Sequence, residues 1–543
     1  MSVEEKLKAQ FPDTVYTALA PPDRHPGFNY KGFHPGRVTR LPRGHVKEPG
    51  YQAFPVDVTW EEDQAIPMRD GIKLYADIFR PADESERVPA IVPWSPYGKV
   101  GTSTLNYDNM GPWRIGIPYQ NLSGYETFEE AVDIYDTITW ISEQPWCNGS
   151  VVMAGNSWLA ISQLNFASRF QHPNLKAIAP WEGLTDLYAH QICRGGIPKP
   201  AFFELILHGS AGVGKAENIG AMVNSRPLFD DYWEEKRIKP EDIKDIPMYL
   251  TASYSTGLHC EGSFRAFELA QASRKWLRVH STQEWHDLYR PEATDDLQRF
   301  YDYYAKGYDG SITKTIVERP EEQWPPARQH IRRYYLDAAT QSFSAVKPVN
   351  SASIPHEGHS LTASSDFTLI FDKYTELCGR PFVKLYMSCN VKDDFDVVVQ
   401  IRKISASGEL LESLNWSPMP APGPKVPNVN VAKHLGQQGM LRASHHVSLQ
   451  PRASEDEVPV YDHRRREAIT PGDIVPLLIP IWPLGVVFEA GEGLVLRISG
   501  HDMSLPEAEA LRLTAPVDEN EGQHTVYTGG EYESYLVIPV IEG

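Results

Sequence analysis

The stretch VVMAGNSWLAISQLNFAS (residues 151–168) places a serine at the junction of a buried strand and a helix. The apolar run VVMA is followed by GNSW and then by apolar residues at helical spacing. Ser157 at such a junction could act only as a helix cap, with its hydroxyl accepting a backbone N–H. Gly155 permits a sharp turn before the serine, however, and the small Ala160 lets the new helix pack closely on the sheet. The stretch therefore predicts a nucleophile elbow, in which Leu159 replaces the second glycine of the usual G-x-S-x-G pattern.

Strand-like and helical segments alternate on both sides of this elbow. An apolar run and an amphipathic helical segment precede it: VPAIV (88–92) and TFEEAVDIYDTITWISEQPW (127–146). Three further strand-like runs follow it: LKAIAPW (175–181), IPMYLTASYS (246–255) and KWLRVH (275–280). This alternation predicts a mostly parallel sheet covered by helices on both faces.

Two parts of the chain break the alternation. Residues 183–245 are helical, aromatic and interrupted by glycines, which indicates a cap inserted over an active site. Beyond the proline-rich ERPEEQWPPARQ, short alternating strands with Gly/Pro turns predict an antiparallel β-sandwich, a jelly roll, which should be non-catalytic. The expected organisation is an extended N-terminal arm (1–50), an α/β domain (51–182 and 246–320), a helical cap (183–245) and a jelly-roll domain (331–543).

Composition and charge exclude several classes of protein. The chain has 543 residues and a formal net charge of -19, and it carries no Lys/Arg cluster, so a nucleic-acid partner is not expected. Its apolar runs are short and broken by prolines, which argues against a membrane span. The stretch MSVEEKLKAQFPD lacks the apolar core of a signal peptide, and five cysteines without CxxC spacing suit a reducing compartment. We therefore expect a cytoplasmic protein, with a homo-oligomer left open by the N-terminal arm.

The histidines do not predict a metal site. The closest pairs among the eighteen, His356 with His359 and His445 with His446, lack a third ligand nearby. No phosphate-binding loop of the Walker type is present either. The sequence therefore predicts neither a metal nor another cofactor.

Several motifs of the chain together carry a family resemblance. They are IPMRDGIKLYADIFRP (66–81), PWSPYGK (93–99), QPWCNGSVVMAGNSW (144–158), HPNLKAIAPWEGLTDLY (172–188), FYDYYAKG (300–307) and YTELCGRPFVKLYMSC (374–389). In this order the chain resembles the serine hydrolases that include cocaine esterase, X-prolyl dipeptidyl-peptidases, cephalosporin acylase and α-amino-acid ester hydrolases. The resemblance implies an α/β-hydrolase domain with an inserted helical cap, followed by a jelly-roll domain. It also implies that Ser157 is the nucleophile. The Tyr97 hydroxyl and the backbone N–H of Trp158 would form the oxyanion hole.

The base of this implied site has two candidates. In the family a histidine follows the last strand of the sheet, and here WLRVHSTQEWHDLY offers His280 and His286. His280 directly ends the strand, whereas His286 lies deeper in the loop. We favour His286, because reaching Ser157 requires a loop excursion beyond the strand end. His259 is expected to line the pocket.

The acid of the implied triad is missing from its usual place. The family has an aspartate after the preceding strand, where this chain has Ser255 or Thr256. Loss of the acid can cost on the order of 10⁴ in rate, because it orients the histidine and stabilises its charged form. Three accounts stay open. Glu261 or Glu182 replaces the acid from another position, a Ser-His dyad suffices for an activated substrate, or the scaffold serves another reaction.

The function predicted from these residues is hydrolysis of an ester or amide of a small organic molecule through a serine nucleophile. Aromatic residues near the predicted cap suit an apolar or aromatic acyl group. The alternative is a non-hydrolytic enzyme of a biosynthetic route that performs a cyclisation, an elimination or a C–C cleavage. The aromatic residues expected at the substrate are Trp181, Tyr188, Phe202 and Phe203.

Overall fold

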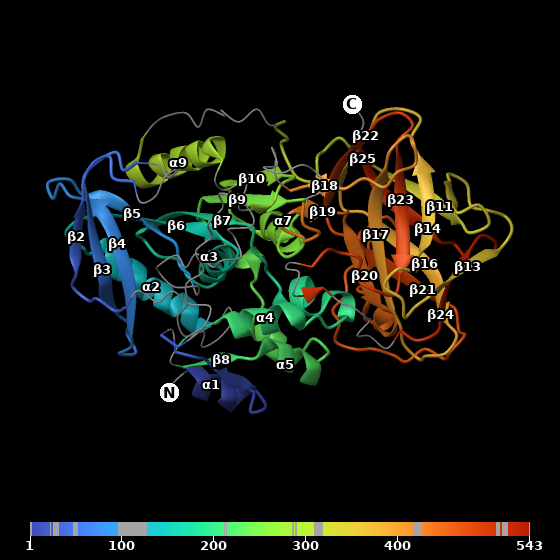
Figure 1. The fold of residues 1–543 in the computed structure, drawn as a ribbon, viewed down its shortest axis with the longest axis horizontal. Coiled ribbons are helices and arrows are strands. Elements are labelled where there is room, and N and C mark those ends of the chain that lie inside the picture. Colours follow the sequence, from blue (N-terminus) through green and yellow to red (C-terminus); the bar gives the residue numbers. More distant parts are fainter. Residues whose placement is uncertain are drawn as a thin grey trace.

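The computed structural model contains three successive β layers, which Figure 1 shows from left to right. They are a small antiparallel sheet, a parallel sheet surrounded by helices, and a large antiparallel domain. The structure describes residues 3–21, 23–24, 32–46, 53–95, 128–210, 212, 214–284, 287, 290–308, 319–415, 426–506, 511–512 and 520–541.

The parallel sheet has the strand order β10-β9-β7-β6-β5, and each neighbouring pair of strands is parallel. Side chains alternate along β6, so its two faces pack against different helices. Val151 and Met153 belong to the core cluster of α2 and α3, whereas Val152 packs with Phe300 of α9. The predicted parallel sheet with helices on both faces is confirmed. The bounds are β5 Val88–Val92, α2 Phe128–Ser142, β6 Cys147–Asn156, α3 Trp158–Arg169, β7 Leu175–Trp181, β9 Met248–Ser253, α7 Cys260–Leu269, β10 Lys275–His280 and α9 Pro291–Lys306.

The N-terminal segment contains regular structure where the sequence indicated only an extended arm. Leu7 on helix α1 and Phe11 just after it are four residues apart, so they share one face and are buried in the core cluster of α3. Strand β1 pairs with β8, which lies between the helices of residues 183–245, and β2 pairs with β3. The position of these helices as a cap stays a prediction. The bounds are α1 Val3–Gln10, β1 Tyr16–Ala18, β2 Val38–Leu41, β3 Val58–Pro67, β4 Lys73–Pro81, α4 Ala201–Gly209, β8 Lys215–Glu217, α5 Ile219–Ser225 and α6 Asp231–Glu235.

The large C-terminal domain is antiparallel, apart from the pairing of β12 with β14. It has a core of its own, which includes Leu336, Phe367, Leu385 and Leu496. The predicted antiparallel domain is confirmed, and its jelly-roll arrangement stays a prediction. The bounds are β11 Gln329–Asp337, β12 Ser342–Ser344, β13 Ala352–Glu357, β14 Ser365–Ile370, β15 Thr375–Gly379, β16 Phe382–Cys389, β17 Asp396–Ile404, β18 Ser413–Leu414, β19 Lys433–His434, β20 Gln438–Arg442, β21 Val475–Pro480, β22 Leu484–Phe488, β23 Gly493–Ser499, β24 Gln523–Thr528 and β25 Tyr535–Ile541.

Helix α7 lies between the two large domains (Figure 1). Its residues Cys260 and Phe264 form one buried cluster with Ala252 of β9 and Trp482 of the antiparallel domain. The antiparallel domain therefore packs directly on the segment that follows β9.

Candidate active site

Ser157 stands between β6, which ends at Asn156, and α3, which begins at Trp158. Its backbone has φ +56° and ψ −123°, a conformation that costs a non-glycine residue about 1–3 kcal/mol. The Ser157 N–H lies 3.2 Å from the Trp181 carbonyl oxygen and 3.1 Å from that of Glu182, at the end of β7. The Ser157 hydroxyl makes no capping hydrogen bond to α3. The cap interpretation therefore does not explain the serine, and the strained turn is the geometry of a nucleophile elbow.

The elbow tolerates a leucine where the usual motif has its second glycine. Gly155 has φ +126°, and a Cβ there would lie 2.5 Å from Cβ of Leu159. The leucine thus occupies the space that the missing Gly155 side chain leaves. Ala160 in turn lies under Gly183, where an added Cβ would stand 3.3 Å from the alanine methyl.

The histidine in contact with Ser157 is His259, which the sequence analysis had placed only in the pocket lining. Its Nε2 lies 3.1 Å from Ser157 Oγ, and its Nδ1 lies 3.5 Å from the Gln191 side-chain nitrogen. The ring directly precedes α7 and is 2% exposed. Burial lowers the pKa of His259 to about 3, so its imidazole is neutral near pH 7 and able to accept a proton.

His280, the alternative candidate for the base, does not supply this contact. His280 turns to a carboxylate instead, with its Nε2 2.7 Å from Glu182 Oε1 and 3.7 Å from Asp287 Oδ2. His286 lies outside the described residues, and so does Tyr97. Among the described residues, the histidine in contact with Ser157 lies in the loop after β9, and the role of His286 stays a prediction.

A carboxyl group that the sequence analysis missed faces His259. Glu284 Oε2 lies 3.9 Å from His259 Nε2, and Glu284 Oε1 accepts a hydrogen bond from Asn156 Nδ2 at 3.3 Å. The residue is 6% exposed, and burial, with the nearby Glu182 carboxylate, raises the pKa of Glu284 well above its usual range. Glu284 stands in the loop after β10, two residues before His286 in the sequence.

Neither glutamate proposed as a relocated acid has its carboxylate on His259. The Glu182 carboxylate lies beside His280, as described above. Glu261 lies 2.5 Å from Nη1 of Arg380 and 2.9 Å from Nε of Arg265. Burial by itself would raise the pKa of Glu261, but the two arginines lower it to about 2. Its carboxylate is thus the centre of an ion-pair cluster between the domains.

The aromatic residues expected at the substrate are placed differently from one another. Tyr188 is 1% exposed in the core, and its hydroxyl donates to the Pro227 carbonyl at 2.7 Å. Phe203 is buried in the same core cluster, with Phe202 edge-on at 5.7 Å. Packing in the core accounts for Tyr188 and Phe203, and their role at the substrate stays a prediction. Trp181 ends β7 beside the Ser157 backbone.

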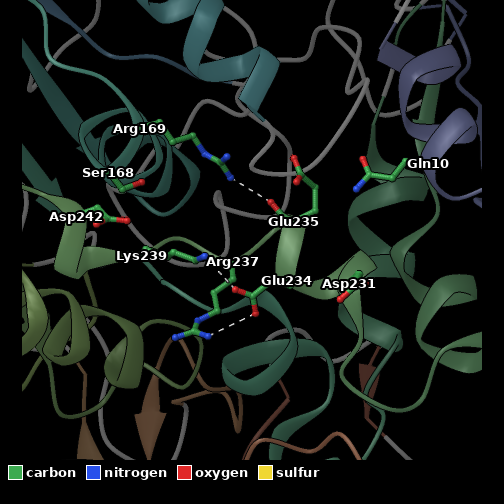
Figure 2. Close-up of a pocket in the computed structure, with 9 residues that line it drawn as sticks. All are labelled: Gln10, Ser168, Arg169, Asp231, Glu234, Glu235, Arg237, Lys239 and Asp242. Atoms are coloured by element: carbon green, nitrogen blue, oxygen red, sulfur yellow. Dashed lines mark hydrogen bonds and ion pairs between the residues drawn. The ribbon is translucent and has the colours of Figure 1, made fainter.

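A separate surface pocket, shown in Figure 2, does not share the chemistry of this site. Two of its cations are paired within the pocket, since Lys239 and Arg237 both lie near the Glu234 carboxylate, at 3.2 and 3.6 Å. Its serine, Ser168, donates to the Asn165 carbonyl of its own helix. Among the described residues there is also no cluster of three metal-ligating side chains, and no helix there is long and apolar enough to cross a membrane.

The fold and the elbow define the chain as an α/β-hydrolase, and comparison with known proteins gives the family. Residues 122–219 match the model of the X-Pro dipeptidyl-peptidase S15 family, and residues 299–537 match that of the X-Pro dipeptidyl-peptidase C-terminal non-catalytic domain. The chain belongs to the serine hydrolase family of cocaine esterase and the X-Pro dipeptidyl-peptidases.

Individual relatives agree with this assignment. Cocaine esterase from a Rhodococcus species is 34% identical over 136 residues, which cover 23% of this chain and 23% of that protein. The crystal structure of a CocE/NonD family hydrolase from Staphylococcus aureus is 26% identical, with a TM-score of 0.81 over 94% of this chain and 97% of that one. An α-amino acid ester hydrolase, at 15% identity, shares the fold with a TM-score of 0.60 over 88% of this chain and 96% of its own.

Proposed function

We propose that this protein hydrolyses an ester or amide of a small organic molecule, with Ser157 as nucleophile, His259 as base and Glu284 as a carboxyl group beside the base. The observation that carries the proposal is the 3.1 Å contact between Ser157 Oγ, held on a strained turn, and Nε2 of a buried histidine. A nucleophile and a neutral base within hydrogen-bond reach are the minimum that serine acyl transfer requires.

The reaction follows from this contact. His259 accepts the hydroxyl proton while Ser157 Oγ attacks the carbonyl carbon of the substrate, and the carbonyl oxygen becomes an oxyanion. The backbone N–H of Trp158, at the start of α3, is the first oxyanion donor. Tyr97 is the second donor that the family resemblance implies. The proton of His259 then passes to the leaving group. In the second half of the reaction His259 accepts a proton from water, which attacks the acyl-enzyme, and the proton then returns to Ser157 Oγ.

A histidine and a carboxyl group have exchanged loops relative to the family resemblance. His259 follows β9, where the family has its aspartate, and Glu284 follows β10, where the family has its histidine. The exchange is feasible because both loops open at the carboxyl edge of one parallel sheet. The contact between a buried histidine and Ser157 favours hydrolysis over the non-hydrolytic alternative.

The proposed acyl-group preference and the proposed cellular location each rest on a few residues. With Tyr188 and Phe203 in the core, the preference for an apolar or aromatic acyl group rests on Trp181 and Phe202. All five cysteines are free and buried, which supports the proposed cytoplasmic location.

Labelling with a fluorophosphonate tests the proposed function. We expect one adduct, on Ser157, and turnover of p-nitrophenyl esters that Ser157→Ala abolishes. Ser168→Ala is the matched control, because Ser168 lies on the same α3 and only bonds a helix carbonyl. A folded protein without an adduct on Ser157, or full turnover by Ser157→Ala, would overturn the proposal. A series of acyl chain lengths then measures the apolar preference.

A further inference from the structure

The two segments that carry His259 and Glu284 are both bonded to the antiparallel domain. Ser157, in contrast, is fixed from within the α/β domain, by α3 and by the backbone at the end of β7. The nucleophile and its partners therefore take their positions from different domains of the protein.

The loop before His259 is held by Gln437, which precedes β20. The Gln437 amide donates to the Tyr254 carbonyl and lies 3.6 Å from Cys260 Sγ, so it bonds on both sides of the histidine. The antiparallel domain also approaches closely here, since a Cβ on Gly485 would stand 2.2 Å from the Tyr254 ring. The path of the chain through His259 thus depends on this domain.

Helix α7, which begins directly after His259, is held by Arg380. The guanidinium of Arg380 bonds Glu261 at 2.5 Å and both carboxylate oxygens of Glu268 at 3.0 Å each. Arg380 is buried, and a bidentate arginine–carboxylate pair fixes orientation as well as distance. The first and third turns of α7 are therefore tied to the antiparallel domain.

The loop that carries Glu284 is also hydrogen-bonded to the antiparallel domain. The backbone N–H of Gln283 donates to the Asn415 carbonyl at 3.0 Å, and Asn415 is fully buried after β18. The segments that carry His259 and Glu284 are thus both anchored to the antiparallel domain.

We propose that Gln437 and Arg380 are positioning residues that set the distance between His259 and Ser157. This inference rests on the proposed function. The antiparallel domain then takes part in catalysis through these two residues. A misplacement of about 1 Å at a base can cost on the order of 10²-fold in rate. Small changes at this interface should therefore lower the rate of the reaction at Ser157.

Gln437→Leu tests the proposal, with Gln400→Leu as the matched control. Both glutamines are buried, at 7% and 1% exposure, and both donate to backbone carbonyls. The Gln400 amide bonds only Gly436 and Met503, within the antiparallel domain. We expect Gln437→Leu to lower kcat and the rate of fluorophosphonate labelling by roughly 10–100-fold with KM little changed, and Gln400→Leu to leave both within about twofold.

A second pair of variants covers the case in which Gln437→Leu does not fold. Arg380→Lys loses the bidentate geometry and keeps the charge, so kcat should fall by roughly tenfold or more. Arg442→Lys, whose partner Asp396 lies within the antiparallel domain, should not lower kcat in this way. Equal kcat losses in test and control variants at equal melting temperatures would overturn the proposal. A wild-type protein that neither hydrolyses esters nor labels would instead refute the proposed function.

Discussion

Replacing His259 by asparagine separates the base contact from the stability of the fold. His259 precedes the first turn of α7 and makes no side-chain cap bond, and asparagine is a favourable residue at that position. The substitution should therefore leave α7 formed, while the 3.1 Å contact with Ser157 is lost. General-base catalysis contributes about 10²–10⁴-fold, which corresponds to about 2.7–5.4 kcal/mol of barrier. We expect kcat for a p-nitrophenyl ester to fall within that range and KM to change little.

The assay for His259→Asn pairs steady-state kinetics with the rate of fluorophosphonate labelling and a melting curve. His280→Asn is the control, because His280 is also buried and its Nε2 faces the Glu182 carboxylate at 2.7 Å. The labelling rate should fall with kcat in His259→Asn and far less in His280→Asn. More than a tenth of the wild-type kcat in His259→Asn, together with complete loss in His280→Asn or His286→Asn, would refute the assignment of the base.

Three further predictions concern the elbow, the Glu284 carboxyl group and the core. Gly155→Ala should prevent the elbow from closing, because its φ of +126° and a Cβ 2.5 Å from the next turn together cost about 2–6 kcal/mol, which kinetics and melting would detect. Glu182→Gln removes the negative charge that helps to raise the pKa of Glu284, so Glu284 should ionise at lower pH and the acid limb of kcat/KM should move down in pH. Lys236→Met leaves the fully buried Glu217 without its 2.9 Å partner and should cost about 3–5 kcal/mol in denaturant unfolding.

Much of the fold could be predicted from the sequence, because its signals are local. Apolar runs separated by amphipathic segments predicted the parallel sheet, and short alternating strands predicted the antiparallel domain. The elbow was also predictable, since the residues that shape it lie within six positions of one another. Helix α1 was missed because it spans a single short stretch whose neighbours are rich in proline and glycine.

The partners of Ser157 were decided only by the tertiary structure. His259 and Glu284 lie 102 and 127 positions from Ser157, and neither stands in the loop where the family resemblance implied its role. A parallel sheet brings its loops to one edge whatever their separation in sequence, so spacing along the chain does not say which loop supplies which group. The direction of each side chain depends on the path of its loop, and that path is held here by Gln437, Arg380 and the Asn415 carbonyl. These contacts join segments more than 100 residues apart, and no local pattern of residues encodes them.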